Sequence, residues 1–180
     1  MCIPTLVLAS MIGGLAPTDA ISVHSLLGEM TNLEVLAEFP EPAYKTIQFS
    51  SYDRRSVAPY APDWYGNSDG FGGEPIPNVM ATLKEPDADG VGVYLLAEVK
   101  GPGAVVRTWS AVINGDLTVT LDGRAKPLYQ GDASRFLQRT YSVLARQAGV
   151  IDADEGSGFR QEDSCYFPIP FARSLRIEWR

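Results

Sequence analysis

Short stretches in the second half of the chain alternate between apolar and polar residues. Leu117, Val119 and Leu121 are separated by polar residues, and the same two-residue period recurs over residues 175–179. This period places alternate side chains on opposite faces, so both stretches are predicted to be half-buried strands. Further strands are predicted at residues 91–99, 104–112 and 166–171. Short strands separated by turns at 101–103 and 122–123 favour an all-β jelly roll or β-sandwich.

Two stretches instead have the period of a helix. Apolar residues recur at helical spacing through residues 22–39, and prolines at positions 40 and 42 end the pattern. This predicts an N-terminal helix, and a capping-box pattern at residues 31–34 predicts that a second helix could begin at Thr31. Residues 134–148 are predicted to form another helix, ended by Gly149. Between these helices, residues 44–52 are extended in character.

The first 21 residues are expected to lie outside the folded domain. Residues 1–18 carry no charge and are mostly apolar, but the stretch is too short and too interrupted by glycine and proline to predict a membrane span. It resembles the apolar core of a secretion signal, with an N-terminal tail as the alternative. We therefore expect one domain at residues 22–180 and a secreted or periplasmic location.

Composition and net charge disfavour several classes of function and of metal site. The net charge is −7, which disfavours nucleic-acid binding because phosphate recognition needs a basic surface. The two cysteines and one histidine rule out a Cys-rich zinc site. Cys165 lies beside Tyr166 and Phe167, which favours a buried, inert thiol. Asp87 and Asp89 imitate the start of a calcium loop, but a strand follows them, so a solvated turn is expected. No metal or cofactor is predicted.

The densest group of chemically active residues lies in a loop-like region at positions 53–78. It contains Asp53 beside Arg54, and then Trp64, Asn67 and Asp69 within the stretch Trp-Tyr-Gly-Asn-Ser-Asp. Aromatic faces suit the C–H faces of sugars, and carboxylate, amide and guanidinium groups suit their hydroxyls. The alternative is structural, with Asp53 and Arg54 as an ion pair and Trp64 in the core.

Several segments, taken together and in order, resemble the N-terminal part of glycoside hydrolase family 172. They cover most of residues 25–179 and comprise SLLGEMTNLEVLAEFPEPAYKTIQFSSYDRRSVAP (25–59), WYGNSD (64–69), KGPGAVVRTW (100–109), LTVTLDG (117–123) and YFPIPFARSLRIEW (166–179). The resemblance implies the first half of a double jelly roll. It also implies assembly into trimers or multiples of trimers.

The resemblance further implies a retaining enzyme that processes fructofuranosides or arabinofuranosides. Retention needs two carboxylates close together. The family's catalytic glutamates are expected downstream of the YFPIPFARS segment, so the chain is expected to be truncated before them and inactive alone, with no catalytic residue assigned. The substrate-contacting residues that it implies are Asp53, Arg54, Trp64, Asn67, Asp69, Arg107 and Trp109. The alternative function is a non-catalytic carbohydrate-binding or assembly module.

Overall fold

The computed structural model describes residues 21–40, 43–51, 53, 55, 58–62, 64, 79–110, 112–149, 159–161 and 163–180. Ten strands and three helical segments lie within these ranges. The predicted secretion signal lies outside them, and so does most of the predicted loop at 53–78. No helix among the described residues has the length and apolar character needed to cross a bilayer.

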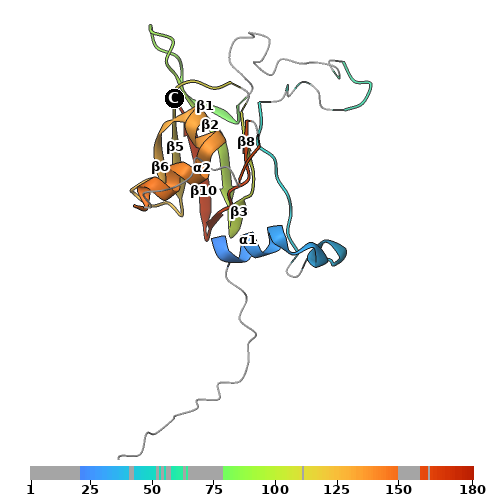
Figure 1. The fold of residues 1–180 in the computed structure, drawn as a ribbon. Coiled ribbons are helices and arrows are strands. Elements are labelled where there is room, and N and C mark those ends of the chain that lie inside the picture. The colour runs from blue at the N-terminus through green and yellow to red at the C-terminus, as the bar shows by residue number, and fades with distance from the viewer. Residues whose placement is uncertain are drawn as a thin grey trace, which may run out of the picture.

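The larger layer of the fold is a five-stranded antiparallel sheet (Figure 1). Its strands, in spatial order, are β1 (Ala81–Lys84), β2 (Val93–Lys100), β10 (Ser174–Trp179), β5 (Asp116–Leu121) and β6 (Tyr129–Asp132). The last strand, β10, lies between β2 and β5 rather than at an edge. Ile177, for example, pairs with Ala97 on one side and with Val119 on the other. The sequence pattern at 175–179 thus marks an interior strand.

Two small sheets form the remaining β structure. The first pairs β3 (Gly103–Val105) with β9 (Ile169–Phe171), and the second has the order β4 (Thr108–Trp109), β8 (Ser164–Cys165), β7 (Arg160–Gln161). The predicted continuous strand at 104–112 is therefore wrong. The chain leaves one sheet after Val105 and enters another at Thr108, a change of partner that alternation along a single strand cannot reveal.

One hydrophobic core joins these sheets to the long helix α2 (Ala133–Gln147). Leu117 and Val119 of β5 are fully buried, as is Phe136 of α2. The ring of Phe136 stacks on Tyr129 of β6, with ring centroids 4.6 Å apart. The predicted β-sandwich is confirmed, and the helix predicted at 134–148 covers part of its core.

The N-terminal helix is shorter than its pattern suggests. Helix α1 (Val23–Thr31) begins after Ser22, whose Oγ accepts the backbone N–H of Ser25 at 3.1 Å. The second segment is a 3-10 helix at Leu33–Ala37, and its cap is Asn32, not the predicted Thr31. The Asn32 side chain accepts the N–H of Glu34, whereas the Thr31 hydroxyl bonds back to carbonyls inside α1.

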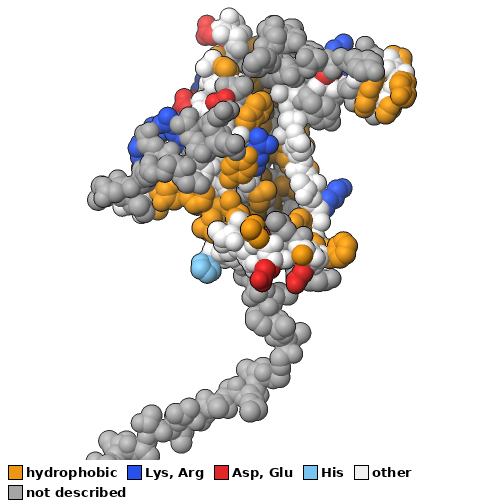
Figure 2. All heavy atoms as spheres, turned by 45° about the vertical axis from the view of Figure 1, so that its right-hand side comes forward, with side chains coloured by type: hydrophobic (Ala, Val, Ile, Leu, Met, Phe, Trp, Pro, Cys, Tyr) orange, Lys and Arg blue, Asp and Glu red, His pale blue; other side chains and the backbone are white. Residues whose placement is uncertain are grey.

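Residues 21–40 and 43–51, which we call the arm, lie on the outside of the sandwich. No residue of α1 is buried, and the segment that follows runs up one side of the domain without joining a sheet (Figure 1). Figure 2 shows apolar side chains and carboxylates gathered around α1, beside the pale blue His24. Leu33, Phe39 and Tyr44 are exposed, whereas Phe49 packs against the core. The arm is therefore anchored near its end and open along most of its length.

Candidate functional site

Two of the predicted sugar-contacting residues lie together on the short sheet that contains β4 and β8. Trp109 pairs directly with Ser164, so their side chains project from the same face of the sheet. Arg107 reaches this face too, since its Nη2 donates to Ser164 Oγ at 3.1 Å. The Arg107 guanidinium also lies 5.7 Å from the ring centroid of Tyr166. We call Arg107, Trp109, Ser164 and Tyr166 the β4–β8 face.

The opposite side of β4 holds this face in place. Thr108 is buried, and its hydroxyl donates to the carbonyl of Leu137 in α2 at 2.6 Å. Nearby, Gln138 Nε2 donates to the carbonyl of Ser110 at 2.9 Å and to Asp163 Oδ1 at 3.2 Å. Because these bonds connect both strands to one helix, the backbone that carries Trp109 is fixed from behind.

The chemistry of the β4–β8 face suits a neutral polyhydroxyl ligand. The Trp109 side chain is 57% exposed, which leaves an aromatic surface open to the C–H face of a sugar. Beside it, the exposed Arg107 side chain supplies several N–H donors, and the buried Ser164 hydroxyl accepts one of them and so helps to hold the guanidinium in place. The stacking of Arg107 on Tyr166 limits the rotamers of a long side chain, which lowers the entropy cost of using it in binding.

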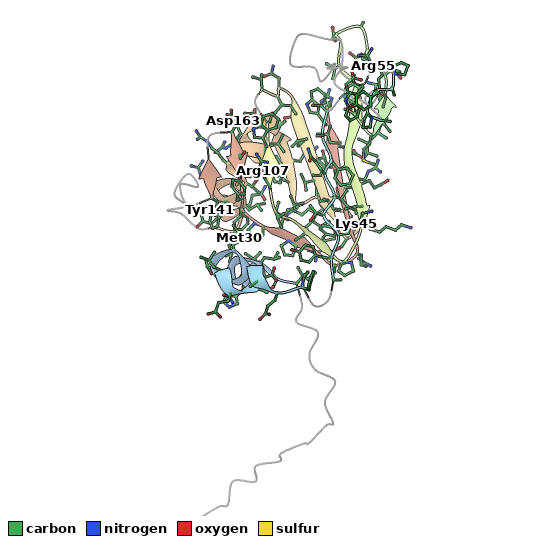
Figure 3. The ribbon with its side chains drawn as sticks, turned by 90° about the vertical axis from the view of Figure 1, so that its right-hand side faces the viewer. Met30, Lys45, Arg55, Arg107, Tyr141 and Asp163 are labelled. Carbon is green, nitrogen blue, oxygen red and sulfur yellow. The ribbon has the colours of Figure 1, made fainter. Side chains whose placement is uncertain are left out.

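Asp53 is placed differently from Arg107 and Trp109. Its side chain is buried and holds Arg55, with Asp53 Oδ2 2.6 Å from Arg55 Nη2. Oδ1 also accepts the backbone N–H of Arg55 at 3.0 Å. The structure thus shows an ion pair between Asp53 and Arg55. Arg54, the predicted partner of Asp53, lies outside the described residues, so that pairing stays a prediction. Figure 3 shows Arg55 well separated from Arg107 and Asp163.

The remaining predicted contacts are only partly described. Trp64 is half-buried, and its backbone N–H donates to the carbonyl of Ala61 at 3.0 Å within a turn. Asn67 and Asp69 lie outside the described residues, so their place in a site stays a prediction. The described part of the chain therefore brings together Arg107 and Trp109, and it keeps Asp53 in a separate structural cluster.

Two carboxylates come close together on the outer face of the five-stranded sheet. Arg176 lies between them, with Nη1 2.5 Å from Glu98 Oε1 and Nε 2.6 Å from Glu178 Oε1. The hydrogen bond from Glu178, and then that from Glu98, raise the pKa of Arg176 above its ordinary value. This is an exposed ion-pair cluster that stabilises neighbouring strands, and it lines neither of the two grooves described below.

The calcium-like pattern is also structural. Asp87 Oδ1 accepts the backbone N–H groups of Val91 and Asp89, and the Val91 bond in particular lowers the pKa of this carboxyl. Lys84 lies 3.6 Å from its other oxygen. The aspartate therefore closes the turn between β1 and β2, as expected. Within the described ranges, no group of three His, Cys, Asp or Glu side chains could hold a metal ion.

Ser164 and Tyr166 were not identified as candidate contacts from the sequence. Tyr166 belongs to the segment YFPIPFARS, but nothing in that segment shows that it lies beside Arg107. Ser164, which bonds Arg107 from fifty-seven residues further along the chain, precedes that segment. The sequence also did not predict two grooves on the surface, both of which are lined in part by Asn114. One, of about 690 Å³, lies against α2, and the other, of about 370 Å³, lies beside Tyr94 and Trp179. Predicting these contacts and grooves requires knowing which strands pair and in what register, which the sequence pattern does not give.

Comparison with known protein families gives one match. A family model described as the GH172 first beta-sandwich domain matches residues 42–180. Neither the curated proteins nor the solved structures include a match to the chain. The matched range contains every strand of the structure and the whole β4–β8 face, and it begins after α1.

Proposed function

Because the chain belongs to glycoside hydrolase family 172, in which it forms the first β-sandwich domain, we propose that it supplies substrate contacts to a furanoside-processing retaining glycoside hydrolase. The expected substrates are fructofuranosides or arabinofuranosides. In this proposal the described residues bind and orient the sugar, and they do not carry out bond cleavage.

The observation that supports a binding role is the exposed ring of Trp109 beside Arg107 and Ser164. A sugar stacked on the indole ring would have the Arg107 guanidinium at its edge, where its own hydroxyls project, and the buried Ser164 would hold that guanidinium from below. The Thr108 and Gln138 hydrogen bonds keep the strand fixed behind this surface. Such a preformed surface reduces the ordering cost of binding.

The arrangement of carboxylates supports the proposal that the described residues do not carry out bond cleavage. A retaining mechanism needs two carboxyl groups about 5–5.5 Å apart on either side of the scissile bond. Neither of the two grooves is lined by two carboxylates, and the close pair Glu98 and Glu178 is held by the shared guanidinium of Arg176. The described residues therefore offer a sugar-contacting surface without a nucleophile and an acid facing one another across a groove.

Titration calorimetry with methyl furanosides tests the binding role directly. The full chain should bind a methyl arabinofuranoside or a methyl fructofuranoside, and Trp109→Ala should weaken that binding about tenfold, equivalent to about 1.4 kcal/mol. Val106→Ala removes another exposed apolar side chain near β4 and is the control. Equal affinity of wild type and Trp109→Ala would show that the β4–β8 face is not the sugar site.

A second candidate function, assembly, is favoured by the N-terminal arm. Leu33 and Phe39 are 74% and 96% exposed, and such side chains are typical of surfaces that become covered in an oligomer. We propose that the arm packs on another copy of this chain, in agreement with the expected homo-oligomer. Light scattering of the wild type should then give a multiple of 19.6 kDa, and Leu33→Ser with Phe39→Ser should lower it. A monomeric wild type would contradict this candidate.

A further inference from the structure

The smaller groove lies at the end of the five-stranded sheet where β2 begins and β10 ends (Figure 1). Its walls come from three segments, which are residues 90–92 with Tyr94, residues 114–115 and residues 179–180. Tyr94 of β2 pairs directly with Trp179 of β10, so two aromatic rings lie side by side in this groove. The volume of about 370 Å³ is near the lower end of the range for ligand sites and suits a single small ring.

The hydroxyl of Tyr94 is the polar group that distinguishes this groove. Tyr94 is only 6% exposed, yet its hydroxyl makes no hydrogen bond to any residue that the structure describes. Every fully buried polar side-chain atom among the same residues has a partner, so this hydroxyl must be accessible from the groove. A ligand can therefore bond to it without breaking a hydrogen bond inside the protein.

Neighbouring residues hold both rings in position. A Cβ added to Gly92 would lie 2.5 Å from the Tyr94 hydroxyl oxygen, so glycine is what lets the ring lie this close to the backbone. The indole N–H of Trp179 donates to the carbonyl of Asn114 at 2.6 Å, and the two ring centroids are 5.3 Å apart. The groove is thus formed before any ligand enters, which lowers the ordering cost of binding.

The chemistry of the groove suits a sugar ring. Trp179 and Val91 offer apolar surface to C–H groups, while the Tyr94 hydroxyl and the amide of the exposed Asn114 can bond to sugar hydroxyls. None of the residues that line this groove is acidic, so it has no carboxyl group with which to cleave a glycosidic bond. The arrangement favours binding alone.

We propose that this groove is a second carbohydrate site, which binds one furanose ring of a glycan through the Tyr94 hydroxyl and the Trp179 ring. The groove lies on the five-stranded sheet, whereas the β4–β8 face lies on a separate short sheet. The inference rests on the proposed function, because the family supplies the class of ligand. It adds a site that the function of the β4–β8 face does not require.

Nuclear magnetic resonance of the full chain tests the site locally. The chain has three tryptophans, and Trp64→Phe and Trp109→Phe identify the third indole N–H signal as that of Trp179. The probes are a trimer of arabinofuranose and a trimer of fructofuranose. At least one of them should shift the Trp179 signal in a saturable way, and this shift should persist in Trp109→Ala. A Trp179 signal that neither trimer moves would overturn the inference.

Two matched tyrosine variants identify the hydroxyl that acts. Tyr94→Phe should raise the dissociation constant read from the Trp179 signal about fivefold, as expected for one neutral hydrogen bond, and leave the melting temperature unchanged. Tyr129 is equally buried, but its hydroxyl donates to the carbonyl of Asp132 at 2.9 Å. Tyr129→Phe should therefore lower the melting temperature and leave binding unchanged.

Either of two results with these variants would overturn the inference. Equal affinity of wild type and Tyr94→Phe would show that the hydroxyl does not contact the sugar. A fall in melting temperature of Tyr94→Phe as large as that of Tyr129→Phe would show that the hydroxyl is already bonded within the protein.

The proposed function and this inference fail separately. If methyl furanosides bind equally to wild type and Trp109→Ala while a trimer still shifts the Trp179 signal, the β4–β8 face is not a sugar site and the groove is. If methyl furanoside binding depends on Trp109 but no trimer shifts the Trp179 signal, only the inference about the groove is wrong.

Discussion

Asp122 shows how a single side chain joins distant parts of the fold. It adopts a left-handed conformation, with φ of 59°, in the predicted turn after β5. Its Oδ1 accepts the backbone N–H groups of Arg173 at 2.6 Å, Ala172 at 3.0 Å and Ser174 at 3.3 Å. These bonds, with that from Arg173 as the largest cause, hold the pKa of the Asp122 carboxyl below its ordinary value.

This arrangement predicts a pH dependence of stability. A carboxyl whose pKa is lower in the folded state stabilises that state fully above its unfolded pKa, near 3.9, and loses the contribution as the pH falls through its folded pKa. Asp122→Asn keeps an oxygen acceptor and tolerates the left-handed backbone, but it cannot carry the charge. Its melting temperature should be lower than wild type at pH 7, and the difference should shrink below pH 4. Parallel melting curves across this range would contradict the assignment.

Gly115 and Gly90 both adopt a left-handed backbone conformation, with φ of 83° and 78° respectively. An added Cβ at Gly115 would collide with the carbonyl oxygen of Arg180, which accepts the N–H of Asp116 at 2.8 Å, whereas nothing lies within 4 Å of the position at Gly90. The first position therefore combines backbone strain with a steric clash, and the second has only the strain.

Gly90→Ala should lower the free energy of unfolding by about 1–2 kcal/mol, the cost of a left-handed alanine. Gly115→Ala should cost about 1–3 kcal/mol more, because β10 must move away from β5. Urea denaturation of both variants measures the difference. If the two variants were equally stable, Gly115 would not be in close contact with the carbonyl group of Arg180.

At the scale of elements, α2 is attached to the sheets by a buried polar layer as well as by Phe136. Thr108 and Thr140 are both buried, with their hydroxyl oxygens 3.4 Å apart. The Thr140 hydroxyl also donates to the carbonyl of Phe136 at 2.6 Å, and Arg139 beside it has non-helical φ and ψ. A hydroxyl bonded back to the preceding turn is a known cause of helix bending, which accounts for the kink at this point.

Thr108→Val tests the importance of this layer. Valine has nearly the same shape but leaves the carbonyl of Leu137 without its hydroxyl donor, so stability should fall by about 1–3 kcal/mol. Thr120→Val lies on the outer face of β5 and should change stability by less than about 0.5 kcal/mol. Denaturation midpoints of the two variants provide the comparison, and equal midpoints would show that the Thr108 bond does not stabilise the attachment of α2.

Elements with a strong internal period could be predicted from the sequence, and elements defined by their partners could not. The strand at 117–121 and the helix ended by Gly149 were found, because each buries one regular face. Strands β4 and β8 have two residues each, too few for a period. The β4–β8 face exists only through their pairing, so Arg107 and Trp109 could be named through family resemblance while Ser164 could not.

At the scale of the whole molecule, the sandwich places the proposed sugar-contacting surface on one short sheet. The core formed by β5, β9, β10 and α2 is continuous, and the β4–β8 face lies on a sheet attached to it through α2. The carboxylate pair closest to a catalytic arrangement, Glu98 and Glu178, lies instead on the outer face of the larger sheet around Arg176. Within the described residues, the proposed binding face and this carboxylate pair thus lie on different sheets.

Release of nitrophenol from a nitrophenyl arabinofuranoside by the purified 180-residue chain is the most direct test of the central claim. The chain should produce no release above the buffer rate while it binds methyl furanosides in a Trp109-dependent way. Sustained turnover that is lost when Glu98 or Glu178 is changed to glutamine would contradict the account, because it would place the catalytic carboxylates within this domain.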